Sequence, residues 1–154
     1  MRWICADQQV AKAVGIPWAQ RTIGLRFPWR EPTAIMLFDD NVLRACVAYT
    51  DYDEVNLGMH IASDGSRRWL TREYLRACFG YPFEQLGVRR VTGLVAASNP
   101  AALRFDTHLG FRMEGRLRHA AQDGSDLLVL GMLRGECRYL RDSEHGQELR
   151  AVGT

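Results

Sequence analysis

The stretch that decides the fold is SNPAALRFDTHLGFRMEGRLR, residues 98–118. An Asn-Pro pair opens it, and asparagine is a good N-cap while proline is favoured at the first helical position. Gly110 supplies the left-handed residue that commonly ends a helix. The stretch therefore predicts a short, firmly bounded helix that leads into a strand at residues 111–118, with an apolar stripe formed by Leu103, Phe105 and Leu109.

Three elements are predicted upstream of this helix. Residues 54–62 alternate between apolar and polar side chains, which is typical of a strand with one buried face. Residues 69–79 have the spacing of an amphipathic helix, with Ser66 as its predicted N-cap, and residues 81–86 are expected to extend it. Residues 91–97 then predict the strand that precedes the quoted stretch.

The remaining segments complete a mixed α/β pattern. Asp7 is a plausible N-cap for a first short helix, whereas Gly15 and three prolines predict an irregular connection up to residue 32. Further strands are expected at residues 2–5, 33–38, 42–49 and 127–133. The order of strands and helices predicts one α/β (α+β) domain, with a mixed, mostly antiparallel sheet and helices on both faces. Residues 138–154 read as a polar C-terminal tail.

Composition narrows the classes of function. The 154 residues carry 20 basic and 18 acidic side chains, and this balance argues against a nucleic-acid-binding surface. No stretch has the apolar length of a signal peptide or a membrane span, so we expect no membrane partner and a cytoplasmic location. Four scattered cysteines without metal-ligand spacing predict reduced thiols and no metal site.

The chain resembles the GNAT superfamily of acyl-CoA-dependent N-acyltransferases. The resemblance is carried by YPFEQLGVRRVTGLVAASNPAALRFDTHLGFRMEGRLR (81–118) and DLLVLGMLRGE (126–136), where an Asn, an Ala three residues on, Leu-Gly-Phe and Glu-Gly are similar to ribosomal-protein-type N-terminal acetyltransferases. IASDGSRRWLTREYL resembles a subgroup often carried by phages and prophages. The resemblance implies a GNAT-like domain over residues 1–137 that transfers an acetyl group from acetyl-CoA to a primary amine.

The resemblance also implies where acetyl-CoA would bind. In this family two central parallel strands splay apart around the pantetheine arm, and here they are residues 54–62 and 91–97. The pyrophosphate would lie at the start of the following helix, where the helix dipole is positive. Arg67 and Arg68 stand where the family has a Gly-rich loop, so they either contact phosphate or form a solvated first turn. The implied cofactor-binding residues are Ile61, Ala62, Ser63, Arg67, Arg68, Trp69, Leu70, Thr71, Asn99, Ala102 and Phe105.

Catalytic groups are less clearly indicated. His60 is the candidate general base, because imidazole titrates near neutral pH, although it is equally well an ordinary hydrogen-bonded sheet residue. Glu54 is a second candidate that would act through water, and Asn56 occupies a position where related enzymes often carry Glu. Asp106 stands where the family often has a Tyr acid, and an ionised carboxylate cannot donate a proton. For Asn99, helix capping alone is at least as plausible as cofactor binding.

The acceptor is predicted only as a primary amine: a protein N-terminus, a lysine or a small amine. Residues 15–32 and 118–126 are expected to line its side of the cleft, since loops of this kind vary freely on one fold. The chain could also form a homodimer. The alternative hypothesis is a catalytically weak or inactive acyl-CoA-binding or protein-interaction module of the same fold.

Overall fold

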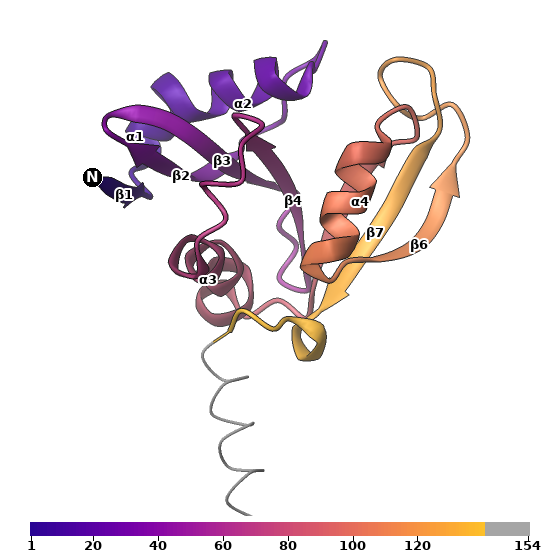
Figure 1. The fold of residues 1–154 in the computed structure, drawn as a ribbon. Helices are drawn as coiled ribbons and strands as arrows, with labels where there is room; N and C mark the ends of the chain where they lie inside the picture. The colour runs from indigo at the N-terminus through magenta and orange to yellow at the C-terminus, as the bar shows by residue number, and fades with distance from the viewer. Residues whose placement is uncertain (141–154) are drawn as a thin grey trace, which may run out of the picture.

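The computed structural model describes residues 1–140, which form one seven-stranded sheet flanked by helices (Figure 1). The strand order is β1-β2-β3-β4-β5-β7-β6. The strands are β1 (Arg2–Cys5), β2 (Thr33–Asp39), β3 (Val42–Thr50), β4 (Asn56–Ser63), β5 (Arg90–Ala96), β6 (Arg112–Leu117) and β7 (Leu127–Leu133). The helical elements are α1 (Gln8–Val10), η1 (Ala11–Gly15), α2 (Ile16–Ile23), α3 (Arg72–Gly80), η2 (Tyr81–Leu86), α4 (Pro100–Leu109) and η3 (Arg134–Glu136).

The predicted fold class is confirmed. All neighbouring strands pair antiparallel except β4 and β5, which are parallel. The parallel ladder holds only three residue pairs, from Asn56↔Arg90 to Gly58↔Thr92. Beyond them, β4 keeps only its β3 partner and β5 keeps only its β7 partner. The two central strands therefore separate toward their C-terminal ends, and we call this gap the splay.

The splay divides the molecule into two halves that differ in how they are covered (Figure 1). In the half formed by β1 to β4, α1 and α2 lie on one face of the sheet and α3 lies on the other. In the half formed by β5, β7 and β6, α4 covers the face that shares its core with α3. Within residues 1–140, no helix covers the opposite face of this second half.

Strand alternation explains the two cores. On β2, Ile35 and Leu37 pack toward α3, whereas Ala34, Met36 and Phe38 pack toward α1 and α2. Because successive side chains of a strand point to opposite faces, a strand covered on both sides is apolar throughout. This is why residues 33–38 form a continuous apolar run.

The helix in the quoted stretch is confirmed as predicted. Asn99 Oδ1 accepts a hydrogen bond from the Ala102 amide at 3.2 Å, and Pro100 is the first residue of α4. Gly110 ends the helix with a φ of 118°. The prediction that Asp7 is an N-cap is also confirmed, because its carboxylate accepts hydrogen bonds from the amides of Gln9 and Val10 at the start of α1.

Two helix predictions were wrong. Residues 15–32 were expected to be irregular, but the helix that begins at Gln8 continues to Ile23 through the π-helical turn η1. The wider turn accommodates Pro17, which lacks an amide hydrogen and would crowd a regular α-helix. Gly15 packs closely on β2, since a Cβ on this residue would collide with Met36 Sδ.

The start of α3 also differs from the prediction. The helix begins at Arg72, and its N-cap is Thr71, whose Oγ1 accepts from the Tyr74 amide at 3.1 Å. Ser66 instead belongs to a preceding turn, where Asp64 accepts from both its amide and its hydroxyl. Trp69, the predicted first residue, is buried ahead of the helix and packs against Tyr74 and Phe105.

The packed domain extends three residues past the predicted boundary at 137. Leu140 is buried, and the Tyr139 ring stacks on Phe79 of α3 with centroids 5.1 Å apart. The rest of the predicted tail, residues 141–154, lies outside the described residues. Among residues 1–140, every helix is too short or too polar to span a bilayer.

Candidate functional site

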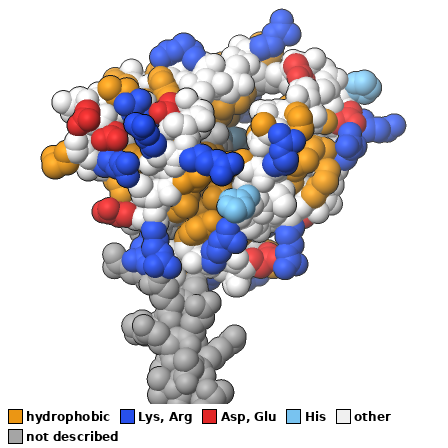
Figure 2. All heavy atoms as spheres, viewed as in Figure 1, with side chains coloured by type: hydrophobic (Ala, Val, Ile, Leu, Met, Phe, Trp, Pro, Cys, Tyr) orange, Lys and Arg blue, Asp and Glu red, His pale blue; other side chains and the backbone are white. Residues whose placement is uncertain are grey.

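The splay exposes one edge of β4 to a ligand. From Met59 to Ser63 this strand is paired with β3 alone, so the backbone groups on its β5 side have no ladder partner. An unpaired strand edge is a template for an extended ligand that carries amide groups. Ile61, Ala62 and Ser63, the three residues predicted to bind pantetheine, all lie on this free edge. Figure 2 shows the surface hollowed between the two halves, with hydrophobic side chains beside the hollow.

The turn between β4 and α3 is held by its own side chains. Ser63 Oγ accepts from the Gly65 amide, Asp64 from the Ser66 amide, and Ser66 Oγ from the Arg68 amide. Asp64 also pairs with Arg44 at 3.5 Å. These contacts occupy amides that a Gly-rich loop would offer to phosphate. The exposed side chains of Arg67 and Arg68 are therefore the groups of this turn best suited to an anion.

The remaining cofactor candidates form the wall on the α4 side. Phe105 of α4 contacts Trp69 with ring centroids 5.3 Å apart, which joins α4 to the turn before α3. Ala102 and Leu70 are partly buried beside the same core. Trp69 is only 2% exposed, so its side chain supports this wall from behind. Asn99 uses its carbonyl oxygen as the helix cap, and its amide nitrogen has no such role.

His60 lies on the face of β4 that points toward α2. Its Nε2 is 2.9 Å from Thr50 Oγ1, and its ring stacks on Trp29 with centroids 4.8 Å apart. Desolvation lowers the pKa of His60 to about 4, an effect that Asp51 partly opposes through its charge. The imidazole is therefore neutral at pH 7, so it is free to accept a proton but is a weak base.

Glu54 is not on the strand face where the sequence pattern placed it. It precedes β4 in an exposed bend and has a left-handed φ of 74°. The bend lies beside the paired end of β4, whereas the strands separate beyond Gly58. His60 and Glu54 are thus at different levels of the strand, and the structure does not bring them together.

Asp106 lies on α4 and is partly buried. Desolvation raises the pKa of Asp106 to about 7, and no hydrogen bond or charge from residues 1–140 counters that effect. The carboxyl is thus close to half protonated at neutral pH, and its protonated form can donate a hydrogen. The sequence could not show this burial, because it depends on tertiary packing.

A polar network on the α2 side of the sheet was missed in the sequence. Thr92 Oγ1 donates to Asn56 Oδ1 at 2.6 Å across the parallel ladder, and Arg90 Nε donates to Thr92 Oγ1 at 3.2 Å. Arg90 also binds the Glu114 carboxylate through both Nη atoms, at 2.7 and 3.4 Å. This ion pair passes over Gly131, where a Cβ would collide with both partners. The network ties β4, β5 and β6 together at the closed end of the splay.

A bridge joins the two halves at the other end. Gln122, in the loop between β6 and β7, accepts from the Arg26 amide at 2.6 Å and from the Phe27 amide at 3.3 Å. Its amide nitrogen donates back to the Phe27 carbonyl at 3.4 Å. The two loops predicted to line the acceptor side are therefore in direct contact, although they are almost one hundred residues apart.

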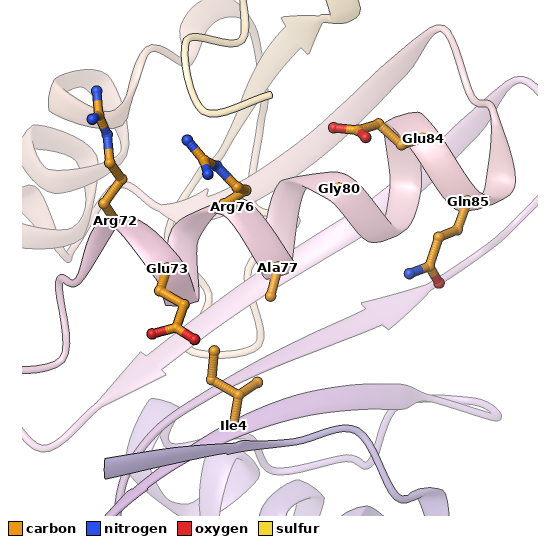
Figure 3. A pocket seen from close by; sticks show the side chains of 8 residues that line it. All are labelled: Ile4, Arg72, Glu73, Arg76, Ala77, Gly80, Glu84 and Gln85. Atoms are coloured by element: carbon orange, nitrogen blue, oxygen red, sulfur yellow. The ribbon is translucent and has the colours of Figure 1, made fainter. Parts of the chain in front are cut away.

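A separate groove of about 750 Å³ lies between α3 and the edge strand β1 (Figure 3). Its lining residues come from β1, α3 and η2, and none comes from β4 or β5. It is therefore distinct from the splay. The four cysteines are buried and form no disulfide within residues 1–140, and burial raises the pKa of the Cys46 and Cys78 thiols to about 12. Those thiols stay protonated and are poor nucleophiles.

Comparisons with known proteins agree on the fold. No family model and no curated protein sequence matches the chain. Among solved structures, a variant of the spermidine N-acetyltransferase SpeG from Vibrio cholerae is 15% identical, with a TM-score of 0.69 over 92% of this chain and 98% of that chain. A second, a spermidine/spermine N-acetyltransferase SpeG from the same organism, is 13% identical, with a TM-score of 0.67 over 88% of this chain and 96% of that chain. A probable acetyltransferase is 20% identical, with a TM-score of 0.60 over 83% of this chain and 74% of that chain.

The class defined by these likenesses is that of the N-acetyltransferase fold. The chain has the GNAT fold, with a mostly antiparallel sheet and one splayed parallel pair. At such low identity the likeness extends to the fold, and acceptor chemistry must be argued from the site itself.

Proposed function

We propose that this protein is an acetyl-CoA-dependent N-acetyltransferase that transfers the acetyl group to a primary amine. The observation that carries the proposal is the short β4–β5 ladder, which leaves the β4 edge free from Met59 to Ser63. This edge suits the amide-bearing pantetheine arm, and Ile61, Ala62 and Ser63 would hold it through their backbones. Arg67 and Arg68 would contact the pyrophosphate, while Leu70, Thr71, Asn99, Ala102 and Phe105 would flank the arm.

The proposed reaction is direct attack of the amine in a ternary complex. A C–N bond forms between the amine and the acetyl carbon, and the C–S bond of the thioester breaks. The amine nitrogen loses a proton and the departing thiolate gains one, so the proton count balances. Backbone N–H groups of the free β4 edge would stabilise the oxyanion that forms after the C–N bond is made and before the C–S bond breaks.

The proton transfers are assigned to two residues on opposite sides of the splay. Neutral His60 would accept the amine proton, directly or through water, and Glu54, in the bend before β4, is too remote from His60 to share that role. Asp106, with its pKa raised to about 7, would supply a proton to the thiolate from the α4 side. This pairing follows a general rule: where an acid and a base share one site, their different environments move their pKa values apart and so fix which group does which task.

Isothermal titration with acetyl-CoA tests the proposal first. Micromolar or tighter binding is expected, whereas no heat at high micromolar protein would remove the basis for an acetyltransferase. A double variant, Arg67→Ala with Arg68→Ala, is expected to weaken binding at least fivefold, since it removes two charge-assisted contacts. The matched control is Lys12→Ala with Arg21→Ala, which removes the same charge from exposed positions of η1 and α2. Equal acetyl-CoA affinity in both double variants would show that Arg67 and Arg68 form a solvated turn and do not contact the cofactor.

The rival hypothesis is an acyl-CoA-binding or protein-interaction module without turnover. It is favoured by the side-chain-filled turn at residues 63–68 and by Asn56 in place of a carboxylate. Thiol release from acetyl-CoA with a broad amine panel separates the two hypotheses. Release that depends on added amine supports the enzyme, and tight binding without release supports the module.

Several finer assignments remain predictions. They are the resemblance to ribosomal-protein N-terminal acetyltransferases, the phage-type subgroup, the cytoplasmic location, a homodimer, and the exclusion of nucleic acid and membrane as partners.

A further inference from the structure

The uncovered face of the second half carries an apolar patch next to the splay. By strand alternation, Leu94 and Ala96 of β5 share a face with Thr92, whose hydroxyl meets Asn56 on the α2 side. Direct cross-strand pairing adds Val129, Leu127 and Leu117 to the same face. We call these five residues the open face. Leu94 on β5 is 43% exposed and Leu117 on β6 is 50% exposed, so the patch has exposed leucines on both sides of β7.

The open face adjoins the acceptor side of the site. Leu94 and Ala96 lie on β5 beyond Thr92, where the strand has already left β4. The loop that joins Leu117 to Leu127 contains Gln122, which bonds to the backbone of Arg26 and Phe27. The side chain of Phe27 is 68% exposed on that opposing loop. Apolar groups thus approach the mouth of the splay from both halves.

The carboxylates near the open face already have polar partners. Glu114 is bound by Arg90, Asp126 pairs with Arg116 at 2.8 Å, and the Asp123 carboxylate accepts from Ser98 and Ser125 hydroxyls. Two acidic residues of this half remain: Glu136 pairs with Arg112 at 2.7 Å, and Asp106 lies on α4 at the other face. Along the strands of this wall a polycationic acceptor would therefore find only carboxylates that already have a cationic partner, and Asp123 in the β6–β7 loop is the one held by hydroxyls instead. At the opposite side of the splay, Asp51 acts on His60 through its charge, so one carboxylate is available near the reacting amine.

We propose that the acceptor is a primary amine carried on an apolar body, with its amine beside His60 and its body across the open face. This inference rests on the proposed acetyltransferase function. A small alkyl or aryl amine and a peptide amino terminus followed by apolar side chains share the required chemistry. A second copy of the chain is a poorer occupant, since a stable dimer buries about 800 Å² on each partner, and the open face offers only five side chains.

Two matched acceptor series test the inference in the wild-type protein, using thiol release at saturating acetyl-CoA. From ethylamine to hexylamine, kcat/KM is expected to rise about threefold for each added methylene that becomes buried. The kcat/KM for hexylamine is expected to exceed that for 1,6-diaminohexane at least tenfold, because the second ammonium group would have to lie against an apolar wall. A leucyl tetrapeptide compared with a glutamyl tetrapeptide distinguishes peptide acceptors from small amines. Preference for diaminohexane or spermidine, or a flat alkyl series, would overturn the inference.

A variant pair locates the effect on the open face. Leu94→Glu is expected to lower kcat/KM for hexylamine at least tenfold and to narrow or reverse the gap with diaminohexane. The control is Leu133→Glu, because Leu133 is 49% exposed on the same sheet face but lies beyond the Arg90–Glu114 pair. Both rates are expected to stay within twofold in this control. Equal losses in the two variants would contradict the assignment.

Acetyl-CoA binding is measured in every variant, so that failure of the two proposals can be told apart. Absence of acetyl-CoA binding in the wild type would refute the proposed function itself. Normal acetyl-CoA binding with turnover of polar amines but of no apolar amine would refute only the acceptor inference. If Leu94→Glu loses acetyl-CoA binding, Leu117→Glu on the edge strand β6 replaces it, with an expected threefold to tenfold loss for hexylamine.

Discussion

The two halves of the sheet solve the same packing problem differently. In β2 and β3, helices cover both faces, so small and apolar side chains such as Ala34, Ala48 and Cys46 are fully buried. In β5 and β7, alternate residues leave the core and reach solvent, as Leu94 and Leu133 do. A buried apolar face stabilises the fold. An exposed apolar face lowers solubility, and a large one commonly marks a binding site. The contrast indicates that the first half is the scaffold and the second half carries one wall of the site.

Two matching glycine substitutions test this contrast with the largest expected change in the free energy of unfolding. In Gly15→Ala the new Cβ meets Met36 inside the covered core, and overpacking is expected to cost about 1–3 kcal/mol, less the gain of about 1 kcal/mol in helix propensity. In Gly131→Ala the new Cβ meets the ends of Arg90 and Glu114, which can swing into solvent, so the cost should stay below about 1 kcal/mol. Thermal unfolding measures both. An equal loss of stability would show that the open half is as tightly packed as the covered half.

The next effect concerns Asp106 on the helix of the open half. Its pKa in the folded protein is about 7, above the usual 3.8, so ionisation of the buried carboxyl destabilises the fold fully above pH 7 and not at all near pH 4. Asp106→Asn should therefore raise the unfolding temperature at pH 8 and leave it unchanged at pH 4. Because Asp106 retains some solvent contact, the gain at pH 8 is expected to be on the order of 1–2 kcal/mol. A gain that does not depend on pH would contradict the raised pKa.

His60, stacked in the covered half, should show the opposite dependence on pH. Its pKa in the folded protein is about 4, below the usual 6.5. Between these two pH values His60 is protonated in the unfolded chain and neutral in the folded protein. Stability from this residue is present above pH 6.5 and is lost as the pH falls toward 4. His60→Gln can still bond to Thr50 and should reduce the loss by about 1 kcal/mol. Denaturant unfolding at pH 7.5 and pH 4.5 gives the comparison, and an equal acid loss in the variant would exclude a role for His60.

The smallest effect is expected at the bridge between the halves. Gln122→Ala removes three exposed hydrogen bonds to Arg26 and Phe27, and it should change the unfolding free energy by less than about 1 kcal/mol. If the bridge orders the acceptor side, KM for the amine should rise twofold to fivefold while acetyl-CoA affinity stays constant. Gln9→Ala, at an exposed position of α1, is the control. A change in acetyl-CoA affinity alone would place the bridge on the cofactor side.

Local signals explain the predictions that succeeded. Asn99, Pro100 and Gly110 act within one turn of their own helix, so the bounds of α4 could be stated from the sequence. Ser66 failed as an N-cap because Asp64 takes its amide and hydroxyl, and Thr71 is better placed once Trp69 is buried. Pro17 failed as a helix breaker because a π-helical turn and close packing of Gly15 on β2 absorb it.

The site divides in the same way between local and distant contacts. The free edge at Ile61, Ala62 and Ser63 was predicted through the resemblance, and the short parallel ladder agrees with it. The stack of Trp29 on His60, the ion pair over Gly131 and the burial of Asp106 could not be predicted, because each depends on residues brought together from distant parts of the chain.

By itself the sequence determined the order of strands and helices, the firm ends of α4 and the mixed sheet, because alternation, caps and turn residues act over a few neighbouring positions. Only the tertiary structure decided which faces are covered, which carboxyl is desolvated and where apolar side chains remain exposed. Those properties depend on distances between segments far apart in the chain, and such distances exist only once the sheet has closed around its core.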